Sequence, residues 1–277
     1  MTSFALPILA EEDQDDLGTQ AAFGGLESPL GVSLAPFGDE PGSQECLPTL
    51  RACQQALARC GRTGEGAVVP LTGLSPAALA FLETTLGEGE VTVNVGGAHA
   101  YQSRETVLPG LWRVVTRALS GEVRSTHLEV GPVPQVALAA NGTATLEALS
   151  IGTPPPGAMN VLPVLAELRH RSQAWRPGQD NHVFSFTLLP MTEPDMAYLE
   201  ARLGHGPVRG ESRGFSRCRV ELTQVRNVWS VQHFNAMGKL ILDTLEVGAV
   251  PTALAAGGHD FEDSATRLDE WLVGTRS

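Results

Sequence analysis

Hydrophobic positions along this chain follow two periods, and the same succession of periods occurs twice. Apolar residues spaced three and four apart predict helices over residues 50–59 and 164–175. Each helix is followed by a short run that predicts a strand, over 67–71 in the first half and 183–189 in the second, where Phe184, Phe186 and Leu188 alternate with polar residues. Each half of the chain is therefore predicted to open with a helix and a strand.

A second helix follows in each half, and its ends are marked by proline and glycine. Ser75-Pro76 and Glu193-Pro194 place a proline at the first helical position after a plausible cap, where its missing N–H costs nothing. Gly87 and Gly204 come directly after the last apolar position, where a residue with positive φ favours glycine. The pattern predicts helices that end at residues 86 and 203.

Beyond these helices both halves change to short runs with period two. In the second half the runs cover 207–212, 216–223, 226–234 and 239–247, and the loops between them are too short to hold a crossover helix. Antiparallel hairpins are therefore predicted, with Trp112 and Trp229 in mid-strand, where the sheet meets the helices. Residues 262–272 are predicted to form a closing amphipathic helix.

An internal duplication links the two halves. Residues 80–134 and 197–251, compared without gaps, are identical at eighteen of fifty-five positions, including Leu128-Glu129-Val130-Gly131 with Leu245-Glu246-Val247-Gly248. The predicted class is α+β: two tandem copies of an α-β-α plus antiparallel β-meander module, pseudo-twofold related, with a C-terminal helix. The predicted boundaries are a disordered acidic segment over 1–45, repeats over 46–140 and 161–277, and a linker over 141–160.

Charge restricts the classes of partner. The net charge is −12, and residues 1–50 hold nine acidic residues and no Lys or Arg. Nucleic acid and anionic membranes are disfavoured as partners because phosphates must be neutralised by cations. A basic peptide or basic protein surface suits the acidic segment better. No run of eighteen apolar residues and no secretory signal occurs, so a cytoplasmic location is predicted.

Catalytic and cofactor motifs are absent from the sequence, which predicts no enzyme, cofactor or metal site. The four cysteines, Cys46, Cys53, Cys60 and Cys218, form no Cys-x-x-Cys pair. Cys218 and His233 lie on strands predicted to be neighbours and are the best candidates for a reactive pair, but no third residue to orient them is evident. An iron–sulfur carrier or redox protein that uses Cys218 remains the alternative from another functional class.

Residues that differ between the repeats are candidates for a functional role, because the residues that the repeats share serve the scaffold common to both. Only the second copy carries an amide and an aromatic residue, Gln232 and Phe234, beside a predicted hairpin tip at Asn235. Such residues suit protein recognition. The alternative is structural: Gln232 and Asn235 cap the turn, and Phe234 packs beneath a helix.

The stretch from Asn227 to Val247, which reads NVWSVQHFNAMGKLILDTLEV, resembles the HupH/HyaF family of [NiFe]-hydrogenase expression and formation proteins, called HoxQ in some organisms. The resemblance extends from about Leu47 to the end of the chain and includes the duplication. At His233 the chain departs from the Tyr or Trp that commonly follows the glutamine. The candidate partner-binding residues from this stretch are Trp229, Gln232, His233, Phe234, Asn235, Lys239, Leu240 and Glu246.

The resemblance implies a dedicated assembly chaperone without turnover. Family members are described as holding the precursor of the iron–sulfur small subunit before twin-arginine export. They are similarly reported to act with a thioredoxin-like accessory chaperone, and with a rubredoxin-like protein where hydrogenase matures in air. A scaffold that only bridges other accessory proteins is a further alternative.

Overall fold

The computed structural model describes residues 40–96, 100–187, 189–214 and 216–274, which fold into six helices and ten strands. The helices are α1 (Ser43–Thr63), α2 (Pro76–Leu86), α3 (Gln135–Thr143), α4 (Val161–Ala174), α5 (Glu193–Leu203) and α6 (Gly258–Gly274). The strands of the first half are β1 (Ala67–Pro70), β2 (Val91–Val95), β3 (Ala100–Glu105), β4 (Leu111–Arg117) and β5 (Val123–Val130). Those of the second half are β6 (His182–Ser185), β7 (Val208–Ser212), β8 (Arg217–Leu222), β9 (Val228–Phe234) and β10 (Leu240–Val247). The predicted α+β class is confirmed.

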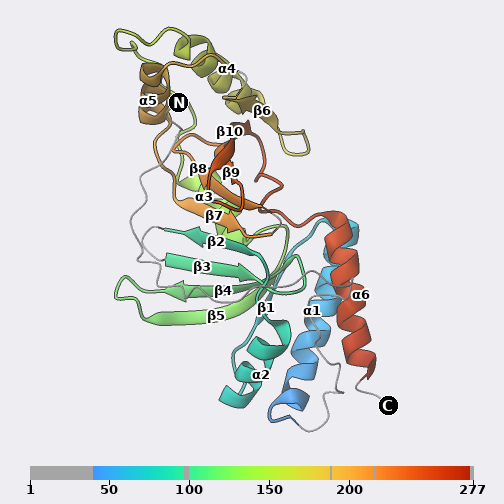
Figure 1. Ribbon diagram of the computed structural model, residues 1–277. Helices are drawn as coiled ribbons and strands as arrows, with labels where there is room; N and C mark the ends of the chain where they lie inside the picture. The colour runs from blue at the N-terminus through green and yellow to red at the C-terminus, as the bar shows by residue number, and fades with distance from the viewer. Residues whose placement is uncertain (1–39, 97–99, 188, 215, 275–277) are drawn as a thin grey trace.

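All ten strands belong to one sheet, in the order β1-β5-β4-β3-β2-β7-β8-β9-β10-β6 (Figure 1). Every pairing is antiparallel, and β2 and β7 join the halves with Val93 opposite Gly210. A Cβ at Gly210 would lie 2.4 Å from the side chain of Leu254, so glycine is required where that leucine crosses the sheet. Both halves of the chain therefore contribute five strands to a continuous surface.

Helices α2 and α5 end as the sequence predicts, and α2 also begins as predicted, whereas α5 begins at Glu193, one residue before the predicted first position at Pro194. Ser75 caps α2 by accepting a hydrogen bond from the Ala78 N–H, and Thr192 forms a capping box with Asp195 at α5. The helices end at Gly87 and Gly204, whose φ angles of 54° and 57° disfavour any residue with a side chain.

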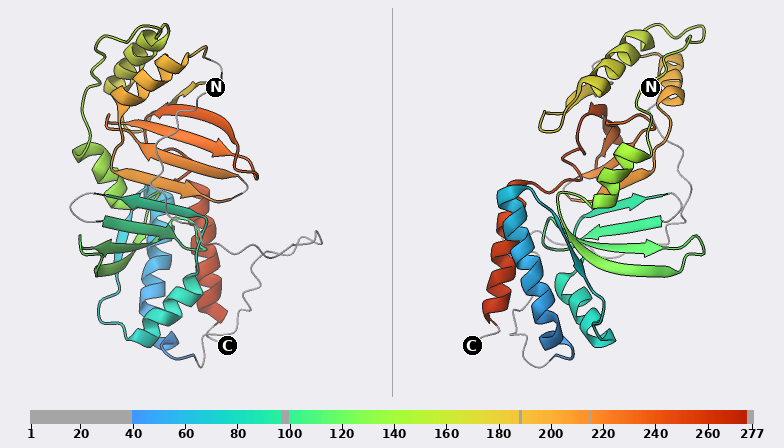
Figure 2. Two further views of the ribbon diagram at one scale, coloured as in Figure 1. Left: turned by 60° about the vertical axis from the view of Figure 1, so that its left-hand side comes forward. Right: turned by 180° about the vertical axis from the view of Figure 1, so that it is seen from behind.

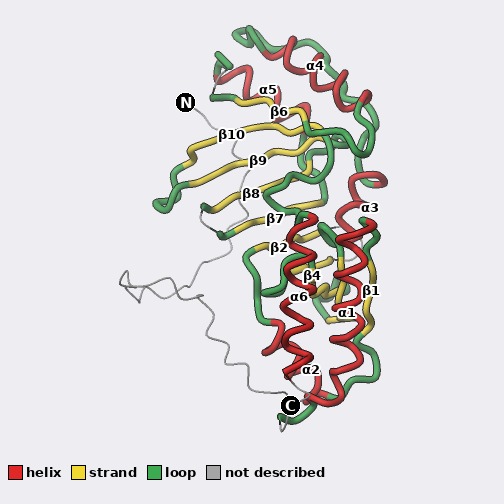
Figure 3. Tube along the Cα trace, turned by 90° about the vertical axis from the view of Figure 1, so that its right-hand side faces the viewer, coloured by secondary structure: helices red, strands yellow, loops and turns green. Residues whose placement is uncertain are grey.

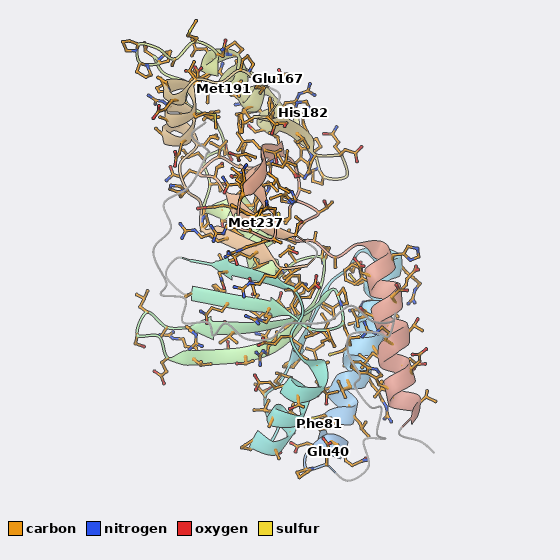
Figure 4. The ribbon with its side chains drawn as sticks, in the orientation of Figure 1. Glu40, Phe81, Glu167, His182, Met191 and Met237 are labelled. Atoms are coloured by element: carbon orange, nitrogen blue, oxygen red, sulfur yellow. The ribbon has the colours of Figure 1, made fainter. Side chains whose placement is uncertain are left out.

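Helices cover the two ends of one sheet face. Helices α1, α2 and α6 pack at one end, over Leu111 and Leu128, whereas α4 and α5 pack at the other, over Val228 and Leu245. Figures 1 and 2 show these two helical layers at opposite ends of the sheet. Figure 4 labels Phe81 on α2 in one layer, and Met191, which precedes α5 and packs against the other layer. The middle of this face carries no helix among the described residues.

The opposite face is covered in its middle by α3 and the segment that contains Leu254 (Figure 2, right). Strand residues that alternate with those of the first face form this core. Trp112 and Trp229 belong to this core, and each is fully buried. Sheet alternation thus separates a polar strip on one face from an apolar core on the other.

Several predicted boundaries were wrong. Helix α1 begins at Ser43, inside the segment predicted to be disordered over 1–45, and residues 1–39 of that segment lie outside the described residues. Helix α3 was not predicted, and its last three residues fall in the predicted linker. Strand β6 stops at Ser185, four residues before the predicted end, because the chain turns there.

Candidate functional site

The predicted partner-binding residues lie on the hairpin of β9 and β10, in three different environments. Gln232 to Leu240 surround its tip. Trp229 and Glu246 pair with each other nearer the opposite end of the two strands. The tube in Figure 3 shows the β9–β10 hairpin reaching beyond the neighbouring strands. The structure therefore brings the middle part of the predicted site together at one projecting tip.

Asn235 shapes this tip. Its side-chain Oδ1 accepts hydrogen bonds from the backbone N–H groups of Met237 and Lys239, at 3.0 and 2.9 Å. A short side-chain acceptor of this kind stabilises a tight turn, and Gly238 has the positive φ that the turn needs. The structure thus gives Asn235 a turn-forming role, while Lys239 remains exposed beside it.

Gln232 and Phe234 point to the polar face of the sheet. The Gln232 amide lies 3.4 Å from a carboxylate oxygen of Asp243 on β10, and both residues are buried. The ring of Phe234 is half-buried beneath the guanidinium of Arg219, which is 5.3 Å from the ring centroid. A cation over an aromatic face is an attractive contact, so Phe234 supports Arg219 as well as presenting its own edge.

Trp229, His233 and Glu246 belong to the opposite face. Trp229 has an exposed fraction of 0 %, so in this structure it contributes to the core and touches no outside surface. Glu246 is half-buried and accepts a hydrogen bond from the Asn181 side chain at 3.0 Å. These contacts give Trp229 and Glu246 supporting roles behind the tip.

Exposed apolar side chains surround the tip and were not among the predicted partner-binding residues. Met237 is 87 % exposed, Ile241 55 % and Leu242 37 % (Met237 is labelled in Figure 4). We call these three residues the tip strip. Strand β6 pairs only with Thr244–Val247 of β10, so among the described residues the ladder does not continue beside Leu240–Leu242. An exposed strand edge next to apolar side chains is a surface to which another extended chain can bind.

The cysteines do not form a reactive or metal-binding cluster in the described part of the chain. Cys46, Cys53 and Cys60 line one side of α1 in one core, whereas Cys218 lies in another. The Cys218 sulfur is 3.9 Å from Nε2 of His233, but burial raises the pKa of this thiol to about 11, which disfavours a thiolate. No group of three potential metal ligands was found among the described residues.

We expect a thiol-specific colorimetric reagent to react slowly with the native protein and rapidly with all four cysteines in denaturant. All four thiols are buried, and burial raises the pKa of Cys53 to about 12. The measurement is the rate of colour release at pH 8 with and without urea. Rapid native reaction at Cys218, identified by mass spectrometry, would contradict this expectation and favour the redox alternative.

Sequence reasoning missed a set of arginines on the polar face. Arg113 and Arg117 on β4, Arg209 on β7, and Arg217 and Arg219 on β8 share this face, because period-two alternation places them opposite the apolar core. The alternating motifs Arg209-x-Glu211 and Arg217-x-Arg219 are the signal that was available. Their accumulation on one surface depends on strand order, which the sequence does not show directly.

None of the described helices combines the length and apolar character that crossing a bilayer requires.

Comparison with known proteins gives consistent matches over both halves. Residues 45–147 and 158–274 match the family described as HupH hydrogenase expression protein, C-terminal conserved region. Hydrogenase expression/formation protein HupH of Rhizobium leguminosarum bv. viciae is 44% identical over 195 residues, which cover 69% of this chain and 68% of that protein. Hydrogenase expression/formation protein HoxQ of Cupriavidus necator is 34% identical over 286 residues, with 98% of each chain covered.

A solved structure of hydrogenase expression protein HupH from Thiobacillus denitrificans is 34% identical to the matched part. The match covers 34% of this chain and 79% of that chain, with a TM-score of 0.32.

Proposed function

Since this chain belongs to the HupH family of hydrogenase expression proteins, we propose that it is a dedicated assembly chaperone for the hydrogenase small subunit. In this proposal it binds the precursor of the iron–sulfur subunit in the cytoplasm, before twin-arginine export, and has no turnover of its own. The coarser role, that of an accessory protein in hydrogenase expression and formation, follows from family membership.

The observation that carries the proposal is the tip strip on the β9–β10 hairpin. A chaperone must recognise surface that its client later buries, and such surface is apolar and rich in unpaired backbone groups. Met237, Ile241 and Leu242 offer apolar contact, and the edge of β10 beside them, which no described strand covers, offers backbone hydrogen bonds. Lys239 beside them disfavours self-association through this edge, because a charged side chain on an exposed strand edge hinders edge-to-edge pairing.

The two halves are proposed to be copies of one module, related by a pseudo-twofold axis through the β2–β7 pairing. Strands β2 to β5 and β7 to β10 have equal lengths in the same order, and the family matches in two stretches. In this interpretation the first repeat over 46–140 is the scaffold, and the second over 161–277 presents the client-binding hairpin. The segment over 141–160 connects them.

Further partners are proposed from the family resemblance: a thioredoxin-like accessory chaperone and, for maturation in air, a rubredoxin-like protein. The acidic N-terminal segment, of which residues 1–39 lie outside the described residues, is proposed to approach the basic twin-arginine signal peptide. Opposite charges accelerate encounter even where they add little affinity. Full precursor binding after Asp13→Lys, Asp15→Lys and Asp16→Lys together would count against this role.

We expect Ile241→Ser with Leu242→Ser to reduce recovery of the small-subunit precursor about tenfold in a pull-down from hydrogenase-expressing cells. Two partly exposed aliphatic side chains that become buried contribute on the order of 1 kcal/mol each to binding. The eluate is quantified by mass spectrometry, with the signal peptide counted separately from the mature subunit.

The matched control changes the other hairpin. Leu119 and Val123 are exposed on the β4–β5 hairpin, and Leu119→Ser with Val123→Ser removes comparable apolar surface. Recovery should be unchanged in this variant. Equal losses of precursor in both variants would refute the tip strip as the binding site. The absence of any hydrogenase component from the wild-type eluate would refute both this site and the small-subunit precursor as the client.

A further inference from the structure

The polar face of the sheet forms a groove between the two helical layers. Five strands from both halves contribute to it: β4, β3, β2, β7 and β8. The hollow above them has a volume of about 580 Å³. Because the described helices cover only the ends of this face, no helix of the described part of the chain covers the groove, which lies on the side of the sheet away from α3.

Arginine dominates the charged lining of this groove. Seven arginines line it: Arg104, Arg113, Arg117, Arg209, Arg213, Arg217 and Arg219. Their ion-pair partners among the described residues are four carboxylates: Glu83, Glu88, Glu211 and Glu221. The groove therefore has an excess of positive charge, although the whole chain has a net charge of −12.

The contacts of Glu211 show why positive charge is in excess in this groove. Its carboxylate lies 3.0 Å from both Arg217 and Arg219, and 3.6 Å from Arg213. Burial opposes ionisation, but the hydrogen bonds and charges of Arg217 and Arg219 hold the pKa of Glu211 below its usual value. One carboxylate cannot satisfy three guanidinium groups, because each guanidinium carries five N–H donors in a fixed planar arrangement.

Arg117, on the other side of the groove, has no carboxylate partner among the described residues. Its guanidinium donates to the side chain of Gln102 at 2.7 Å and to the carbonyl of Gly121 at 3.0 Å. These neutral acceptors fix its direction and leave its charge uncompensated. The groove thus holds unpaired positive charge in both halves of the sheet, at Arg117 and around Glu211.

We propose that this arginine-lined groove binds an acidic, extended polypeptide segment of a partner protein. The bound carboxylates would take up the free donors of Arg117, Arg213, Arg217 and Arg219, since a planar guanidinium matches a carboxylate in two parallel hydrogen bonds. The groove lies on the same sheet face as Gln232 and Phe234. A client can therefore contact it together with the tip strip, but binding in the groove does not depend on the hydrogenase function.

Charge favours a peptide over nucleic acid as the occupant. Four carboxylates stand among the seven arginines, and the rest of the molecule is strongly negative, so a long polyphosphate would be repelled at both short and long range. A short acidic segment needs to neutralise only the local excess of positive charge. A basic segment, by contrast, is repelled by this face.

The test uses a fluorescein-labelled peptide with the sequence of residues 8–17 of this chain, which contains five carboxylates. Its affinity for the full chain is measured by fluorescence anisotropy at low and moderate salt. We expect binding that weakens about tenfold with Arg217→Gln and Arg219→Gln together, and also weakens as salt screens the charges. A peptide with Gln and Asn in place of the acidic residues should not bind.

The matched control is Arg51→Gln with Arg62→Gln, which removes the same charge from exposed positions on α1 and should leave affinity within about twofold of the wild type. Equal weakening by the control pair would overturn the site. If a ten-nucleotide RNA bound more tightly than the peptide, the proposal that the groove binds a polypeptide would be overturned. A third outcome is that the peptide binds only after the acidic residues at positions 11–16 of the chain are changed to their amides. That result would show that the chain's own N-terminal segment occupies the groove, and would overturn the proposal that a partner protein does.

Discussion

Replacing Trp229 by alanine should lower the free energy of unfolding by about 3–5 kcal/mol, the range typical of a large aromatic side chain removed from a core. Trp229 is fully buried, and packs with Val220, Val231 and Leu254 between the sheet and its covering layer. The cavity left by an indole is too large for these neighbours to close. Urea denaturation followed by far-ultraviolet circular dichroism measures the loss.

Two further tryptophans act as controls for this prediction. Trp175 is only half-buried after α4, so Trp175→Ala should cost less than about 1 kcal/mol. Trp112, in the corresponding strand of the first half, donates a hydrogen bond from its indole N–H to the Gly131 carbonyl at 2.9 Å. The Trp229 indole N–H has no partner among the described residues. Trp112→Phe should therefore cost roughly 1 kcal/mol more than Trp229→Phe; equal costs would contradict this assignment.

A second large effect is expected at Glu105, whose replacement by glutamine should stabilise the protein at pH 8. Burial raises the pKa of this carboxyl to about 7, and only the N–H of Gly110, which donates to it at 2.9 Å, opposes the shift. The folded protein thus favours the protonated acid. In the unfolded chain the carboxyl ionises at its ordinary, lower pKa.

The direction of the pH dependence follows from this raised pKa. Below the unfolded pKa both states are protonated, so Glu105 adds no pH dependence there. Stability is lost as pH rises from that value through about 7, because the folded state must then ionise a buried group or keep its proton. The full loss is on the order of 3 kcal/mol.

Glutamine keeps the oxygen that accepts from Gly110 and removes the ionisation. Glu105→Gln should therefore raise the free energy of unfolding by most of that amount at pH 8 and by little at pH 4. Chemical denaturation at both pH values measures the two changes. Glu122→Gln, at an exposed position before β5, is the matched control and should change stability by less than about 0.5 kcal/mol at either pH. A gain that is the same at both pH values would show that the effect is not ionisation.

Two surfaces with different chemistry emerge in one molecule: an apolar tip strip on the β9–β10 hairpin and an arginine-lined groove beside it. Phe234 connects them, because it ends β9 next to the tip and supports Arg219 in the groove. An assembly chaperone that recognises both an apolar edge and an acidic segment would discriminate its client better than either surface alone.

The sequence by itself determined the elements whose signals are local. Ser75 and Gly87 bound helix α2, and Pro194 and Gly204 locate α5 to within one residue. Each signal acts over a few residues through a cap, a fixed proline φ or a positive φ. The same is true of the four strands in the second half, where alternation and short turns are sufficient. The apolar period likewise located α4 and α6 to within four residues.

Only the tertiary structure decided how the two halves of the sheet are joined and which surfaces stay open. The pairing of β2 with β7 joins residues more than a hundred positions apart, and no local pattern encodes it. That pairing brings Arg117 from one half and Arg217 from the other onto one face. Trp229 is buried in the core on the opposite face, as its mid-strand position predicts. Periodicity predicts that two faces exist; packing over the whole chain determines which face is covered, because burial is a property of neighbours that are distant in sequence.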